Sequence, residues 1–279
     1  MSAAIIFILL LVLMLTGMPI SIALGLTVLT FLFTMTEVPI ESVALKLFTG
    51  IEKFEIMAIP FFILAGNFLT HGGVARRMIN FATSMVGHWH GGLGLGGVVA
   101  CALFAAVSGS SPATVVAIGA ILLPAMVKQG FPNKFGAGVI TTSGALGILI
   151  PPSIVMVMYS VSTNTSVGAL FMAGVVPGIL LAAFLGFTTW NRARKFGYPR
   201  LPKATWAQRA KAFKDSAWGL FLIVVVMGGI YTGIFTPTEG AAVGAVATGV
   251  MAWRRGGLYG GKLREAFEAT ASGSAMVFL

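Results

Sequence analysis

Two polar interruptions in apolar stretches carry the residues that could do chemistry. The first is the pentapeptide SGSSP at 108–112, and the second runs from Gly144 to Ser153 through Pro151 and Pro152. Proline lacks a backbone N–H and disfavours helix at the residue before it, so each interruption should break a helix and free carbonyl oxygens. Hydroxyl and carbonyl oxygens are neutral ligands that suit a small cation such as Na⁺.

Ionisable residues are nearly absent from this region. From Met78 to Trp190 the only Lys, Arg, Asp or Glu residues are Lys128 and Lys134, which we place outside the core. A proton relay would need Asp, Glu or His at membrane depth, so the sequence favours a cation site over proton coupling. The available hydroxyls belong to Ser108, Ser110, Ser111, Thr114, Thr141, Thr142 and Ser143.

The half-helices that begin at Pro112 and Ser153 add free N–H groups, which favour an anion. A cation and an anionic substrate can therefore share one site, and we expect Ser111, Thr114 and Ser153 to contact the substrate. The alternative is that the small residues only let helices pack closely, as they do in membranes. A single break would favour that alternative, whereas two proline-containing breaks together favour a functional site.

The composition is that of a polytopic membrane protein. The 279 residues are 57% hydrophobic and only 9% charged, and their mean hydropathy is +0.95. The net charge of +10 arises largely from eight Lys and Arg residues between Asn191 and Asp215, which the positive-inside rule explains for a cytoplasmic loop. The positive-inside rule accounts for this charge without a polyanion, so we do not expect nucleic-acid binding.

Apolar segments along the chain define the expected elements. They cover 2–16, 18–36, 56–70, 91–127, 135–160, 165–190, 217–235 and 238–253. As one helix, 91–127 would be about 55 Å long, against a hydrocarbon core of ~30 Å, so it must bend back as a hairpin. The bend belongs at SGSSP, with Pro112 in the first helical position and Ser111 as its N-cap. Segment 135–160 should be broken near its middle.

Charge sets the expected orientation. If the basic loop 191–215 is cytoplasmic, counting crossings places the N-terminus outside. The N-terminal apolar stretch lacks a basic leader and a convincing cleavage site, so we interpret it as a membrane helix and not a signal peptide. IESVALKLFTGIEKFEI, at 40–56, is predicted to be an amphipathic interfacial helix. A new apolar run near 271 is expected to start a further membrane segment that is cut short at Leu279.

Other candidate residues are weaker. His88 and His90 flank Trp89, which favours interfacial anchoring over a metal site, because no third ligand is apparent. Glu239 is interpreted first as part of a helix cap and second as a functional carboxylate. A serine nucleophile would need a nearby base, and the three histidines lie on other segments, so no enzyme activity is expected.

Four motifs resemble a known family. They are FFILAGNFL (61–69), SGSSPATVVAIGAILLPAM (108–126), GALGILIPPSIVMVMYS (144–160) and GIFTPTEGAAVGA (233–245). They are similar to motifs of the DctM-type large membrane subunit of tripartite ATP-independent periplasmic (TRAP) transporters. The resemblance implies an all-α polytopic membrane protein of the inverted-repeat, elevator type, of which this chain holds the first repeat and the start of the second.

The resemblance also implies function, partners and ligands. The function is Na⁺-dependent import of organic acid anions, such as C4-dicarboxylates or sialic acid, across the bacterial inner membrane. The partners are a small DctQ-type membrane subunit, a periplasmic DctP-type binding protein and membrane lipid; Na⁺ is the coupling ion, and no organic cofactor or transition metal is implied. By motif position, Na⁺ binding falls on Ser108, Ser110, Gly147, Ile150 and Pro152.

The implied organisation places scaffold and interfacial helices at 1–90, a transport region at 91–160, further scaffold helices with the basic loop at 161–257, and the start of the second repeat at 258–279. The second hairpin, the second broken helix and an acidic residue of that half are missing, so we expect the chain alone not to transport. Two other functions stay open: a stand-alone Na⁺-coupled carboxylate carrier, and a non-transporting membrane scaffold or relic whose breaks only pack helices.

Overall fold

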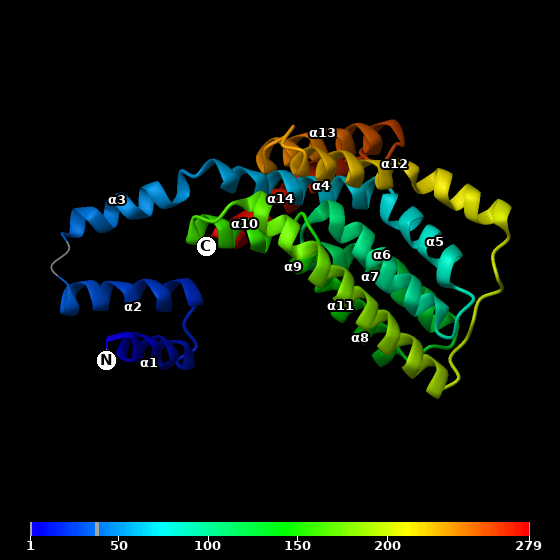
Figure 1. The fold of residues 1–279 in the computed structure, drawn as a ribbon, viewed down its shortest axis with the longest axis horizontal. Coiled ribbons are helices and arrows are strands. Elements are labelled where there is room, and N and C mark those ends of the chain that lie inside the picture. The colour runs from blue at the N-terminus through cyan, green and yellow to red at the C-terminus, as the bar shows by residue number, and fades with distance from the viewer. Residues whose placement is uncertain (1, 37–38, 279) are drawn as a thin grey trace. The chain divides into compact units, whose positions relative to one another are not determined.

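The computed structural model describes residues 2–36 and 39–278 (Figure 1). These residues form helices and connecting loops, without a strand. Contacts group them into an N-terminal unit, which contains α1 to α3, and a larger unit that runs from Phe54 to Met276.

In the N-terminal unit, α1 (Ser2–Leu15) packs against α2 (Ile20–Met35), and α3 (Ile40–Ile51) follows Pro39. The prediction of a helix at 40–56 is confirmed over most of its length. A short 3-10 turn, η1 (Phe54–Met57), starts the larger unit and replaces the last part of that helix.

The helices of the larger unit follow in chain order. They are α4 (Ala58–His71), α5 (Val74–Val86), α6 (Gly92–Ser108), α7 (Ser111–Lys128), α8 (Asn133–Gly144), α9 (Leu146–Leu149), α10 (Ile154–Thr163), α11 (Val167–Lys195), α12 (Trp206–Tyr231), α13 (Pro237–Arg254) and α14 (Lys262–Phe278).

Helix α6 lies at the centre of the larger unit. It contacts α4, α5, α7, α8, α9, α11 and α12. Its glycines permit this close packing: a Cβ at Gly96 would lie 2.7 Å from the Thr83 hydroxyl on α5, and one at Gly97 would lie 2.4 Å from the Leu122 side chain on α7. Figure 1 shows α6, α7, α8 and α11 running along one another, while α13 packs on α4 and α12.

Five stretches of the described residues are long and apolar enough to cross a membrane. They are Phe54–His71, Ser111–Lys128, Asn133–Thr163, Val167–Lys195 and Trp206–Tyr231. Large apolar side chains stay exposed on the outer helices, for example Phe184 on α11 and Val224 on α12. An exterior of this kind fits a lipid environment.

The basic segment 191–215 is more helical than a loop. Helix α11 continues to Lys195 and α12 begins at Trp206, so the non-helical part covers only 196–205. Basic residues in the last turn of α11 suit the negative end of its dipole. A capping box between Thr205 and Gln208 starts α12 earlier than hydropathy alone predicts.

Candidate functional site

The hairpin predicted at 91–127 is confirmed. Helix α6 ends at Ser108, Gly109 adopts a left-handed conformation with φ +61°, and α7 returns from Ser111. The predicted N-cap was wrong by one residue. Ser110 is extended and its hydroxyl accepts a hydrogen bond from the Ala113 N–H at 3.4 Å, so Pro112 occupies the second helical position. Left-handed Gly109 completes the reversal one residue earlier than proline alone suggested.

The predicted break in segment 135–160 is also confirmed. After the single turn of α9, Ile150 is extended, the Pro151–Pro152 bond is cis, and α10 starts after Ser153. Ser153 caps α10, because its hydroxyl accepts from the Met156 N–H at 3.5 Å and donates to the Ile148 carbonyl at 2.7 Å. The chain thus forms two half-helices on either side of an extended segment.

The hairpin tip and the helix break lie against each other. The Ile154 N–H donates to the Gly109 carbonyl at 3.0 Å, which joins the two interruptions directly. A Cβ at Gly147 would lie 2.9 Å from the Ser111 backbone nitrogen, so only glycine permits this approach. The two interruptions, which are separate in the sequence, are therefore in direct contact in the fold.

Three hydroxyl groups at the tip and the break are fully buried. Ser108, Thr114 and Ser153 are each 0% exposed. The Thr114 hydroxyl donates to the Ser110 carbonyl at 2.8 Å and lies 3.4 Å from the Ser108 hydroxyl. Ser110 and Ser111 are half-buried at the same turn. Of the three expected substrate contacts, Thr114 and Ser153 already use their protons inside the protein, so Ser111 is the strongest as a donor to an anion.

The break leaves oxygen atoms without donors. Because Pro151 has no N–H, the Gly147 carbonyl lacks its usual helix partner. The Ile154 N–H, which would pair with Ile150 in a continuous helix, bonds to Gly109 instead. In the described part of the chain, the fully buried Ser143 hydroxyl also has no hydrogen-bond partner. Buried neutral oxygens that lack hydrogen-bond donors are suitable ligands for Na⁺.

The surroundings of the tip contain one contact that the sequence analysis did not single out. A Cβ at Gly66 of α4 would lie 2.9 Å from the Ser108 Cβ, so α4 packs directly on the end of α6. Glycine inside an apolar helix was the available signal, but it does not say which neighbour approaches.

Predicted residues outside the tip and break keep structural roles. Glu239 forms a capping box: its carboxylate accepts from the Thr236 N–H at 2.8 Å, and its own N–H donates to the Thr236 hydroxyl at 3.3 Å. In the residues that the structure describes, no group of three potential metal ligands occurs near His88 or His90. Desolvation and the nearby Arg200 and Arg194 cations lower the pKa of His90.

Comparison with known proteins identifies the family to which this chain belongs. A family model described as the tripartite ATP-independent periplasmic transporter, DctM component, matches residues 7–279. The chain belongs to this family of integral inner-membrane permease subunits, which is a transporter family and not an enzyme family.

Individual relatives carry related names. The chain is 78% identical to the C4-dicarboxylate TRAP transporter large permease protein DctM of Rhodobacter capsulatus, over 88% of this chain and 59% of that protein. It is 52% identical to the protein of the same name from Vibrio cholerae serotype O1, over 88% of this chain and 54% of that protein. The sialic acid TRAP transporter permease protein SiaT of Haemophilus influenzae is 38% identical, over 84% of this chain and 38% of that protein. The chain thus spans little more than half the length of its C4-dicarboxylate relatives.

Proposed function

We propose that the complete subunit containing this chain is the large permease of a Na⁺-driven TRAP transporter, which imports an organic acid anion across the bacterial inner membrane. It works with a small DctQ-type membrane subunit and receives its substrate from a periplasmic DctP-type binding protein. C4-dicarboxylates are the favoured substrates, because the relatives that are 78% and 52% identical carry that name. The hydrogen bond from Ile154 to Gly109, which joins the two interruptions, is the observation that carries the proposal.

In this proposal the neutral oxygens of the tip and break hold the coupling ion. The ligands are the hydroxyls of Ser108 and Ser110 and the carbonyls of Gly147, Ile150 and Pro152. Bound Na⁺ supplies positive charge in a region whose sequence has no carboxylate or guanidinium. The N–H groups at the starts of α7 and α10, with the Ser111 hydroxyl, orient the substrate carboxylate beside it.

The division of labour follows from the same proposal. Residues 91–160 form the part that moves, 1–90 and 161–257 form the scaffold, and 258–279 begin the second repeat. Helix ends rich in Lys and Arg at 191–215 face the cytoplasm, and the N-terminus faces the periplasm.

Replacing one hydroxyl ligand tests the ion site. We expect Ser108→Ala or Ser110→Ala, in the full-length native chain, to raise the Na⁺ concentration for half-maximal thermal stabilisation about tenfold, since a lost polar partner costs roughly 1–3 kcal/mol. Ser110 also caps α7, so the informative quantity is the Na⁺ dependence and not stability without Na⁺. Ser166→Ala is the matched control, because Ser166 caps α11 in the same way. If both variants respond to Na⁺ as Ser166→Ala does, these hydroxyls do not bind the ion.

Transport itself is tested in proteoliposomes that contain the full-length chain and its small subunit, with the binding protein outside. We expect succinate uptake to require both an inward Na⁺ gradient and the binding protein. Equal uptake without the binding protein would instead indicate a stand-alone carrier. Absence of uptake, together with a lack of Na⁺-dependent stabilisation, would leave a membrane scaffold in which the breaks serve only packing.

A further inference from the structure

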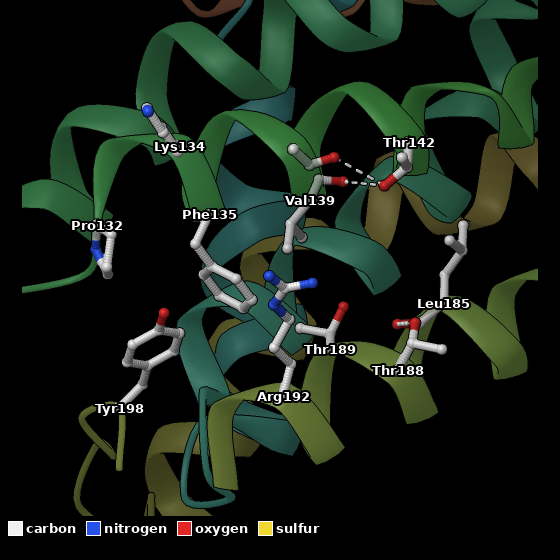
Figure 2. Close-up of a pocket in the computed structure, with 11 residues that line it drawn as sticks. Pro132, Lys134, Phe135, Val139, Thr142, Leu185, Thr188, Thr189, Arg192 and Tyr198 are labelled. Atoms are coloured by element: carbon white, nitrogen blue, oxygen red, sulfur yellow. Dashed lines mark hydrogen bonds between the residues drawn. The ribbon is translucent and has the colours of Figure 1, made fainter. Parts of the chain in front are cut away.

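A separate cavity of about 400 Å³ lies between α8 and α11, at the end of α11 that carries the basic residues. Figure 2 shows the Arg192 side chain extending from α11 into the space beside the Phe135 ring and below Val139, with Thr189 next to it and Tyr198 facing Phe135. Lys134 also lines the cavity, but its ammonium group points away from Arg192. None of these residues belongs to the hairpin tip or the helix break.

The polar groups at this end of the cavity are donors without acceptors. In the described residues, no hydrogen bond or ion pair joins the Arg192 guanidinium, the Thr189 hydroxyl or the Tyr198 hydroxyl to another protein group. The other two lining hydroxyls are already engaged, since Thr188 donates to the Leu185 carbonyl and Thr142 to the carbonyls of Gly138 and Val139. Among the described residues that line the cavity, none is Asp or Glu. A ligand that complements such a site is an anion that accepts several hydrogen bonds.

The surrounding charge has the same sign. The segment 191–215 carries eight Lys and Arg residues, and its only acidic residue is Asp215 at its end. Arg192 is held over the Phe196 ring, with its central guanidinium carbon 5.8 Å from the ring centroid, and this contact leaves its N–H groups free to bind a ligand.

The cavity is amphipathic along its length. Val139 and Leu185 line it together with the polar groups, and an aromatic cluster closes one side, with the Phe135 and Tyr198 ring centroids 4.7 Å apart. Phe184, which is 65% exposed, lies one helical turn before Thr188 on α11. A small dicarboxylate would place its second charge against apolar side chains, whereas a lipid presents one anionic group followed by hydrocarbon.

We propose that this cavity binds the phosphate of an acidic phospholipid headgroup. Arg192 and Thr189 donate to the phosphate oxygens, the Tyr198 hydroxyl donates to a phosphate or glycerol oxygen, and Lys134 adds positive charge at the rim. The acyl chains leave along the exposed apolar side of α11. Basic pockets between membrane helices suit anionic headgroups for these electrostatic reasons. This site is independent of the proposed transport function, because lipid binding requires neither Na⁺ nor substrate.

The test measures lipid retention by the full-length native chain, purified in a neutral detergent. Dioctanoyl phosphatidylglycerol and dioctanoyl phosphatidylcholine are titrated separately, and bound lipid is counted by native mass spectrometry. We expect phosphatidylglycerol to be retained in preference, and Arg192→Gln to weaken its apparent affinity about fivefold. Thr189→Val, which keeps the side-chain shape, should weaken it about threefold.

Arg194→Gln is the matched control, since it removes the same charge from the same helix. The central guanidinium carbon of Arg194 lies 5.5 Å from the centroid of the Trp190 ring, and Arg194 is not among the described residues that line the cavity. Equal losses for Arg192→Gln and Arg194→Gln would show only general attraction to basic helix ends and would overturn the proposal. If Arg192→Gln does not fold, the Thr189→Val variant serves as the test. An unchanged affinity of Thr189→Val for phosphatidylglycerol then overturns the proposal.

Two soluble anions distinguish a lipid from a free ligand. Glycerol 3-phosphate and succinate are added as competitors at millimolar concentration. The proposal expects neither to displace phosphatidylglycerol appreciably, because each lacks the hydrocarbon that the apolar side of the cavity contacts. Displacement by succinate, lost in Arg192→Gln, would instead assign the cavity to the carboxylate substrate and overturn the lipid assignment.

Discussion

At the scale of single residues, Gly109 meets two independent demands. Its φ of +61° lies in the left-handed region, and an added Cβ would sit 2.9 Å from the Pro152 carbonyl oxygen. The first demand comes from the reversal of the hairpin and the second from the contact with the helix break. A substitution here therefore tests the assembly of the site and not only the turn.

We expect Gly109→Ala to destabilise the protein more than Gly233→Ala. Gly233 also has a positive φ, +75°, but an added Cβ there meets nothing within 4 Å. The control should cost about 1–2 kcal/mol for the backbone conformation alone, and Gly109→Ala should cost a further ~1–3 kcal/mol because the tip must move away from Pro152. Thermal and denaturant unfolding in detergent measures both, and Na⁺ should stabilise only the Gly233 variant. Equal losses in the two variants would mean that the tip and break are not in contact.

At the scale of elements, proline and glycine made the breaks predictable. Pro112 and the Pro151–Pro152 pair act on their own backbone neighbours, so the hairpin and the broken helix followed from the sequence. The exact cap did not, because the choice between Ser110 and Ser111 depends on where left-handed Gly109 completes the turn. Likewise, hydropathy placed the end of α11 too early and the start of α12 too late. Both helices continue into the basic segment, since basic residues are good helix formers.

Contacts between elements were beyond the sequence. The approach of Gly66 to Ser108 and the cavity between α8 and α11 both depend on how separate helices pack. Lys134 was expected to lie outside the core, and Arg192 was grouped only with a basic loop. Periodicity and charge give the face and the end of a helix, but they do not identify its neighbour.

The start of α13 offers a test of an element boundary. We expect Thr236→Ala to lower stability by about 1 kcal/mol, because it removes the hydroxyl that accepts from the Glu239 N–H. Thr205→Ala, in the equivalent capping box of α12, should lower the stability by a similar amount.

Glu239→Gln should keep Na⁺-dependent uptake, since the amide oxygen of Gln can still accept from the Thr236 N–H. Loss of uptake with unchanged thermal unfolding would show that this carboxylate serves transport and not capping.

At the scale of the whole molecule, the scarcity of charge in the central region bears on how the transport proposed for the complete subunit would respond to voltage. No Asp or Glu lies between Met78 and Trp190, so in this part of the chain no protein carboxylate neutralises a bound cation. In the transport cycle proposed for the complete subunit, the charge that crosses with this part of the chain would then be that of the cargo, the number of Na⁺ ions minus the charge on the substrate. Each uncompensated positive charge would gain about 2.3 kcal/mol per 100 mV of membrane potential. In the proposed function, the membrane potential as well as the sodium gradient would thus drive accumulation of the anion whenever the Na⁺ charges outnumber the charges on the substrate.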